Sequence, residues 1–124
     1  MTRQVQRRSE RGAVTAELAS VLPILLAVTV GLVWLLAVGA AQVRTVDAAR
    51  ETARALARGD DEGTAVSRGR QVAPPGSTVT VSRGPGEVRV TVTGEVPGPG
   101  GLFDGLPTPT VRASAVAAAE GPPS

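Results

Sequence analysis

The feature that most constrains this chain is a long uncharged run. Residues 18–43, LASVLPILLAVTVGLVWLLAVGAAQV, contain no acidic or basic side chain. A helix over this run would be ~39 Å long at 1.5 Å per residue, which exceeds the ~30 Å hydrocarbon core of a bilayer. The run therefore predicts a transmembrane helix, assigned to residues 13–43. Any soluble fold has to be built from the residues that follow.

Small residues recur along the predicted membrane helix. Their spacings of four, three, four and four place them on one helical face, and a face of small side chains allows a second helix to approach closely. We therefore predict helix packing through this face, although an Ala-rich composition explains the pattern equally well. The residues are Ala16, Ser20, Pro23, Ala27 and Gly31.

Basic residues flank the run on both sides. Residues 1–12, MTRQVQRRSERG, form a short basic leader with four arginines, which we expect to be a disordered tail and to act as a cytoplasmic anchor. Four more arginines follow within residues 44–58. Because the two counts are equal, the positive-inside rule does not settle the orientation of the helix.

The helical pattern continues past the membrane. Residues 44–58 are rich in strong helix formers, and Gly59 supplies a stop. They predict an amphipathic extension, so that one helix would run from about residue 14 to residue 58. Its apolar face is expected to contain Val43, Val46, Ala49, Ala53, Leu56 and Ala57.

Residues 59–118 predict a small α+β domain. A short helix is expected within residues 60–76, opened by an Asp N-cap and closed by two prolines. Valine then alternates with polar residues in TVTVSR and EVRVTVTG, on either side of Gly84-Pro85-Gly86, which predicts a β-hairpin.

Residues 94–109 are rich in Gly and Pro and predict a loop, with Leu102, Phe103 and Leu106 as its large apolar side chains. TVRASAVAA, residues 110–118, is a possible third strand, and residues 119–124 are expected to be disordered. The valine face of the sheet needs a cover, and the apolar face of residues 43–57 can supply it. The predicted fold class is α+β: a long membrane-spanning helix whose amphipathic extension packs on a small antiparallel sheet of about three strands.

Composition argues against several functions. The chain has no Cys and no His, so disulfides, zinc sites and thiol or imidazole catalysis are not expected. With one Phe and no Tyr, a base-stacking surface for nucleic acid is not expected either. No spacing of Ser, Asp and Glu suggests a nucleophile with its base. We therefore predict neither an enzyme nor a cofactor, metal or small-molecule site.

One acidic residue, Glu17, stands at the start of the apolar run. A carboxylate well inside a bilayer is unfavourable by roughly 2.5–3.5 kcal/mol. Glu17 could avoid this by lying at the interface, one turn from Arg11. A second interpretation uses Gly12: if the chain were cut after it, the new α-amino group of Ala13 would lie about one helical turn from Glu17 and could neutralise it.

These residues carry a resemblance. RGAVTAELASVLPILL resembles the processing site of type IV prepilins, with a basic leader, a Gly, a Glu five residues later and an apolar helix. Within that class, ELASVLPILLAVTVGLVW followed by VDAARETARALA is similar to TadE-like minor pilins of tight-adherence (Flp-type) pili. The C-terminal TVRASAVAAAE also resembles the end of that family.

The resemblance implies a substrate and building block. A prepilin peptidase would cut between Gly12 and Ala13, and Glu17 would set register by pairing with the α-amine of a neighbouring pilin subunit. The implied partners are the membrane, the peptidase, other pilin subunits and the pilus assembly platform. The implied location is the cytoplasmic (inner) membrane, in a single pass with the C-terminal region outside, and the pilus or cell surface after processing. Implied roles are pilus biogenesis, adhesion or secretion.

Two other interpretations of the sequence remain open. The chain could be an unprocessed single-pass membrane accessory or scaffold protein that keeps its leader. It could also be a secreted protein cut near Gly39-Ala40-Ala41, but the run is longer than the ~7–15 apolar residues of a signal peptide. The N-terminus of the mature protein separates the three.

Overall fold

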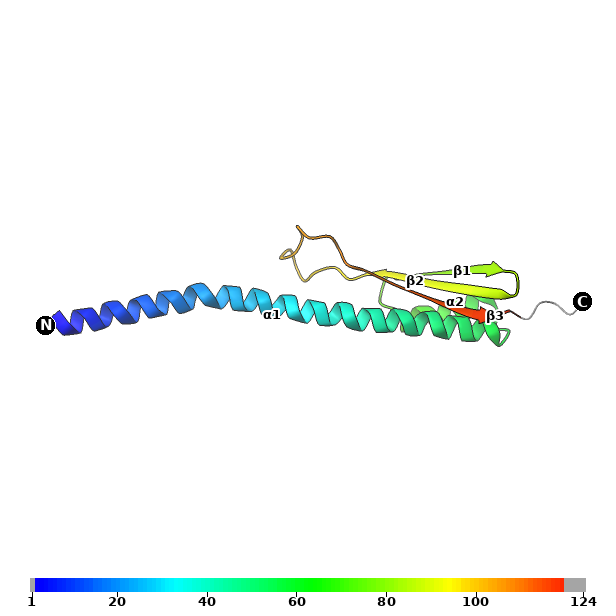
Figure 1. Cartoon of the computed structure of the whole chain (residues 1–124), viewed down its shortest axis with the longest axis horizontal. Helices are drawn as coiled ribbons and strands as arrows, with labels where there is room; N and C mark the ends of the chain where they lie inside the picture. The colour runs from blue at the N-terminus through cyan, green and yellow to red at the C-terminus, as the bar shows by residue number, and fades with distance from the viewer. Residues whose placement is uncertain (1, 120–124) are drawn as a thin grey trace, which may run out of the picture. The chain divides into compact units, whose positions relative to one another are not determined.

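The structure, a computed structural model, describes residues 2–119, with side chains from Val5 onward. All but the first residue of the predicted disordered tail, residues 119–124, lies outside this range. The elements in chain order are α1 (Thr2–Ala57), α2 (Glu62–Val72), β1 (Thr78–Gly84), β2 (Glu87–Glu95) and β3 (Thr110–Ala118) (Figure 1). The chain divides into two units, residues 1–35 and 36–124, which are described separately.

The described part of the first unit is helical throughout. We predicted a disordered leader over residues 1–12, and this prediction is wrong, because α1 already begins at Thr2. The leader is rich in Arg, Gln and Glu, which are good helix formers, and it contains no Pro. Extending an existing helix also avoids the unfavourable nucleation step, so the leader continues the helix of the apolar run.

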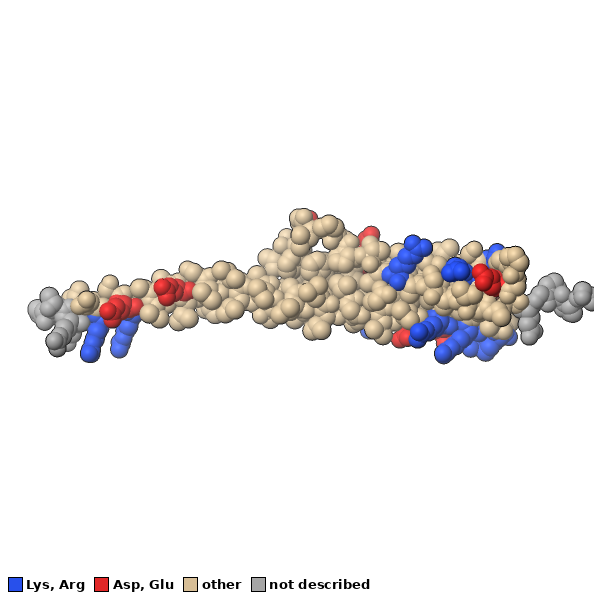
Figure 2. Space-filling model, viewed as in Figure 1, with Lys and Arg blue, Asp and Glu red and all other residues tan. Residues whose placement is uncertain are grey.

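The apolar side chains of the first unit have no protein cover. Leu22 is 62% exposed, Leu26 66% and Leu32 57%. A window of α1 has a mean hydropathy of 2.7, and the helix is long and apolar enough to cross a membrane. Figure 2 shows a tan, uncharged stretch between charged side chains on either side. An apolar helix this exposed needs apolar surroundings, which suggests insertion into a membrane.

The second unit contains a three-stranded antiparallel sheet in the order β1-β2-β3 (Figure 1). The hairpin turn is Pro85-Gly86, and Gly86 has a φ of 73°, which favours glycine. Val90 pairs with Val81 on one side and with Ala115 on the other, so the valines and alanines share one face. The predicted hairpin and third strand are confirmed.

That apolar face is covered as predicted by the extension of α1. Ala49 and Ala53 of α1 join Val90 and Val92 of β2 in one buried cluster. The predicted helix face was only partly right. Val43 is 61% exposed and Ala57 is also exposed, because the core lies towards other positions of the helix. The fold class is α+β, as expected.

The buried face of α1 also contains two threonines that the apolar pattern did not reveal. Thr45 and Thr52 are fully buried, and their hydroxyls donate to the carbonyl oxygens of Ala41 (2.7 Å) and Ala48 (2.8 Å) one turn earlier. This local bonding satisfies their polar atoms, so burial is not penalised. Helix α2 approaches α1 closely at Gly69, next to Thr52 and the Ala48 backbone.

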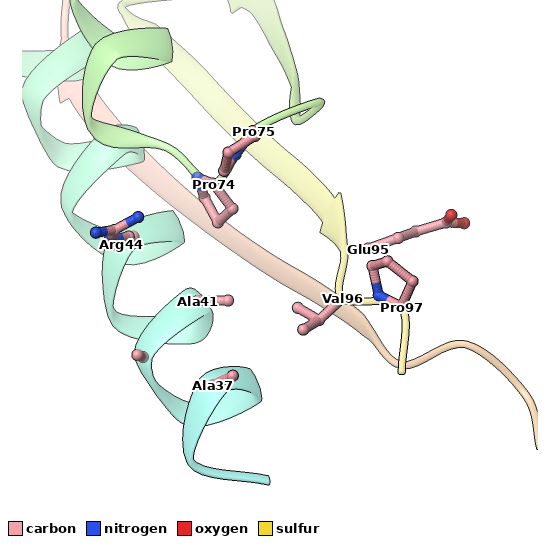
Figure 3. A pocket seen from close by; sticks show the side chains of 9 residues that line it. Ala37, Ala41, Arg44, Pro74, Pro75, Glu95, Val96 and Pro97 are labelled. Atoms are coloured by element: carbon pink, nitrogen blue, oxygen red, sulfur yellow. The ribbon is translucent and has the colours of Figure 1, made fainter. Parts of the chain in front are cut away.

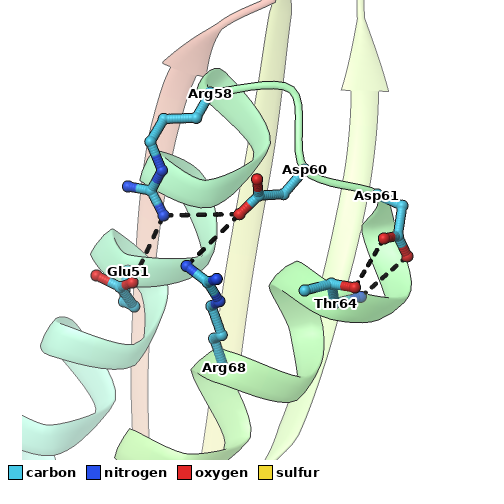
Figure 4. A network of polar contacts seen from close by, with 6 residues as sticks. All are labelled: Glu51, Arg58, Asp60, Asp61, Thr64 and Arg68. Carbon is cyan, nitrogen blue, oxygen red and sulfur yellow. Dashed lines mark hydrogen bonds and ion pairs between the residues drawn. The ribbon is translucent and has the colours of Figure 1, made fainter.

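An ion-pair cluster joins the end of α1 to α2 (Figure 4). The Asp60 carboxylate lies 3.6 Å from both the Arg58 and the Arg68 guanidinium, and Arg58 also lies 3.8 Å from Glu51. These contacts bridge the turn at Gly59, whose φ is 91°. Because these side chains are partly exposed, each ion pair contributes at most about 1 kcal/mol to holding α2 beside α1.

Asp61 caps the N-terminus of α2, as the sequence predicted. Its carboxylate accepts from the Thr64 hydroxyl (2.7 Å) and backbone N–H (3.1 Å), and these hydrogen bonds lower the pKa of Asp61 (Figure 4). Because the pKa of Asp61 is lowered in the folded state, the cap stabilises the fold fully at pH values above the ordinary pKa of an aspartate. This stabilisation is lost as the pH falls through the folded-state pKa.

Candidate processing and assembly site

The residues singled out for processing lie on one exposed stretch of α1. Gly12, Ala13 and Glu17 are all exposed, and every described side chain up to Leu26 is exposed as well. The Gly12–Ala13 bond lies inside the helix, so its polar groups take part in helical hydrogen bonding. The Thr15 hydroxyl donates to the Arg11 carbonyl oxygen (2.9 Å) across this bond.

The fold of the chain does not require glycine at position 12. A Cβ built there meets nothing within 4 Å, and Gly12 is not among the glycines with positive φ. Glycine inside a helix is unfavourable by roughly 1 kcal/mol relative to alanine. Gly12 therefore weakens the helix without a packing reason. Gly39 also has open space around an added Cβ, so open space alone does not distinguish Gly12. What distinguishes Gly12 is open space together with the residues that follow it, Ala13 and Glu17.

A weak point in the helix matters because hydrolysis needs an accessible bond. A peptide bond within a regular helix has to unwind locally before a peptidase can hold it. Gly12 reduces the free energy needed for that unwinding. The hydrogen bond from the Thr15 hydroxyl to the Arg11 carbonyl oxygen is of a kind that often bends helices slightly. Cutting would turn the Gly12 carbonyl into a carboxylate and leave a free α-amine on Ala13.

Glu17 has no partner within the described part of the chain: no hydrogen bond or ion pair engages its carboxylate there. In the uncut helix it lies four turns from the start, far from the positive end of the helix dipole. After a cut at Gly12–Ala13 it would lie within the first turns of a new helix, where unpaired N–H groups favour an acid. The new α-amine, with a pKa near ~7.7–8.0, would be a cation at neutral pH.

Within the residues that the structure describes, nothing packs on the outer part of the predicted helix-packing face. Ala16, Ser20 and Pro23 are exposed, while Ala27 and Gly31 are half-buried. The Ser20 hydroxyl donates to the Ala16 carbonyl oxygen (2.9 Å), which leaves the face without an unsatisfied hydroxyl. Packing of a second helix on this face stays a prediction.

The second unit contains a groove that the sequence did not predict (Figure 3). It has a volume of about 500 Å³ and lies between α1, the α2–β1 connection and the end of β2. In Figure 3, Ala41 and Val96 point towards each other across the groove, whereas the charged ends of Arg44 and Glu95 point away from it. The groove could not be predicted from sequence because its walls come from three segments far apart in the chain. The lining residues are Ala37, Ala40, Ala41, Arg44, Pro74, Pro75, Glu95, Val96 and Pro97.

Comparison with known proteins finds a match over the segment that contains Gly12, Ala13 and Glu17. Residues 12–54 match the family model described as TadE-like protein. The match begins at Gly12 and includes Glu17 and the whole predicted helix-packing face, but it does not reach the sheet. No curated protein and no solved structure matches the chain. The predicted resemblance is confirmed over these residues: residues 12–54 of this chain are similar to TadE-like proteins.

Proposed function

We propose that this chain is a minor pilin of a Tad (Flp-type) pilus, cut after Gly12 by a prepilin peptidase and assembled through its apolar helix. The observation that carries the proposal is where the TadE-like match begins. It starts at Gly12, a helical glycine that packing does not require. Five residues later comes Glu17, whose carboxylate has no partner among the described residues.

In this proposal the uncovered helix has two successive environments. Before assembly, the lipid bilayer surrounds its apolar side chains. After assembly, the helices of neighbouring subunits and the pilus core surround them. Glu17 would pair with the Ala13 α-amine of the next subunit, and the unit of residues 36–119 would face the outside. Pilus biogenesis, adhesion and secretion are the processes in which such a subunit would act.

The Glu17→Gln variant tests assembly separately from cutting. We expect it to be cut like the parent, because the change lies beyond the bond, but to enter pili at a level at least about tenfold lower. A hydrogen-bonded charge pair contributes roughly 1.5–3 kcal/mol, and 1.4 kcal/mol corresponds to tenfold. The measurement is quantitative immunoblotting of sheared pili against the membrane fraction.

Glu10→Gln is the matched control, since it removes the same charge from the leader that the cut discards. It should assemble like the parent. Equal incorporation of the Glu17→Gln variant and the parent into pili would refute the pairing role.

The second candidate is a permanent single-pass membrane accessory protein. The uncovered apolar helix favours it as well, because a bilayer alone would satisfy that helix. It differs from the pilin proposal in one respect, since its leader is never removed.

A further inference from the structure

The loop between β2 and β3 displays apolar side chains at one end of the second unit. Leu102 is 60% exposed and Leu106 is 56% exposed, and Asp104 is the single charged residue of residues 96–109. Figure 1 shows this loop extending beyond the ends of the strands. Two large apolar side chains are thus exposed within five residues of an almost uncharged loop, so this end of the second unit presents apolar surface.

The loop has a defined internal structure. Its base is closed by the Val96 N–H, which donates to the Pro109 carbonyl oxygen (3.1 Å). Within it the Leu106 N–H donates to the Phe103 carbonyl oxygen (2.9 Å), and the Phe103 side chain lies over Gly98, where an added Cβ would be 3.1 Å from Phe103 Cβ. Phe103 is thereby half-buried within the loop. Leu102 and Leu106 are left on its outside.

The loop leaves the sheet beside the last turns of the uncharged run. Glu95 and Thr110, at its two ends, are paired across β2 and β3. The groove of Figure 3 places Val96 and Pro97 opposite Ala37 and Ala41 of α1. On the other strand, the Gln42 side chain donates to the Arg112 carbonyl oxygen (3.1 Å). The loop base is therefore level with residues 37–44.

In a bilayer that α1 crosses through its uncharged run, residues 37–44 would lie at the membrane surface. The run of residues 18–43 makes ~39 Å of helix, whereas the hydrocarbon core is ~30 Å thick and the bilayer with its headgroups ~40–45 Å. In an upright helix that enters the hydrocarbon at Leu18, the residues after about 37 emerge into the headgroup region. The apolar groove wall and the loop base are continuous with this segment of α1.

We propose that the loop of residues 96–109 is a second membrane contact, with Leu102 and Leu106 inserted at the boundary between lipid headgroups and acyl chains. The charges near this end balance, with Arg44 and Arg112 against Glu95 and Asp104. Burial of apolar side chains therefore drives the contact, rather than attraction to anionic lipid. The contact holds the sheet unit against the bilayer while α1 is in the membrane.

The test is lipid quenching of a single tryptophan in the full-length chain. Trp34→Phe removes the native tryptophan, and Leu102→Trp or Leu106→Trp then places the probe on the loop. Val116→Trp is the control, because Val116 is also exposed (50%) but lies near the far end of β3. Each protein is reconstituted into vesicles of phosphatidylcholine and phosphatidylglycerol, with or without bromine on the acyl chains.

Both loop probes are expected to lose most of their emission in brominated vesicles, and the control to keep nearly all of it. Loop probes that are quenched no more than the control would overturn the proposal. Loop emission that instead changes with the protein-to-lipid ratio, without bromine quenching, would assign the loop to contacts between copies and would equally overturn it. No peptidase is present, so the result is independent of whether the chain is cut in cells.

Discussion

The Gly12→Leu variant is expected to keep its leader completely in cells that cut the parent protein. A leucine side chain at this position has open space around it and raises the helix propensity by roughly 0.8–1 kcal/mol over glycine. The variant should therefore fold and insert normally. What it changes is the bond itself, since the residue before the cut gains a side chain and the helix becomes harder to unwind locally. Intact-mass measurement of the purified membrane protein reads out the result.

Gly39→Leu is the matched control for this experiment. Gly39 is also a helical glycine with nothing within 4 Å of an added Cβ, but it lies far along the chain from the proposed cut. The control should be cut like the parent. Normal removal of the leader from the Gly12→Leu variant would show that Gly12 plays no part in processing.

The Gly69→Ala variant is expected to lower the stability of the second unit by about 1–3 kcal/mol, the usual range for overpacking. An added Cβ would overlap Thr52 Oγ1 and come within 3.4 Å of the Ala48 carbonyl oxygen. Helices α1 and α2 would have to separate there. At a helix position with free space around it, a change from glycine to alanine would instead raise the stability. A loss of stability therefore indicates that α1 and α2 are in close contact at Gly69. Thermal unfolding in detergent, followed by circular dichroism, measures it.

A second substitution makes this prediction specific. Thr52→Ala removes the overlapping oxygen, whose hydrogen bond is only to Ala48 of its own helix. The double variant Thr52→Ala/Gly69→Ala should recover most of the lost stability, which a double-mutant cycle records as a favourable coupling. A Gly69→Ala protein as stable as the parent, or a double variant no better than Gly69→Ala alone, would disprove the close approach of the two helices.

The sheet could be predicted from sequence because its signals are local. Alternating valines identify the strands and their inner face, and Gly84-Pro85-Gly86 marks the turn. The Asp61 cap and the two prolines after α2 are equally local signals. For the same reason the spacing of Gly12, Ala13 and Glu17 was visible in the sequence, since Ala13 and Glu17 are only about one helical turn apart.

Features that depend on long-range packing could not be predicted. Thr45 and Thr52 look polar in a helical pattern, yet they are fully buried because each bonds to its own helix. Gly69 lets α2 approach α1, and a glycine within a helical segment gives no local sign of such a contact. The groove beside Ala41 and the exposed loop leucines depend on where β2 ends relative to α1. In retrospect, the four-residue spacing of Ala65 and Gly69 was the available signal for helix packing.

The most direct test of the proposed function is the N-terminus of the mature protein. Membrane and sheared-pilus fractions of cells that contain a prepilin peptidase are analysed by intact-mass and N-terminal peptide mass spectrometry. The pilin proposal predicts a chain that begins at Ala13. A chain that begins at Met1 or Thr2 in both fractions would contradict it and favour the unprocessed membrane protein, and a start near Gln42 would favour a secreted one.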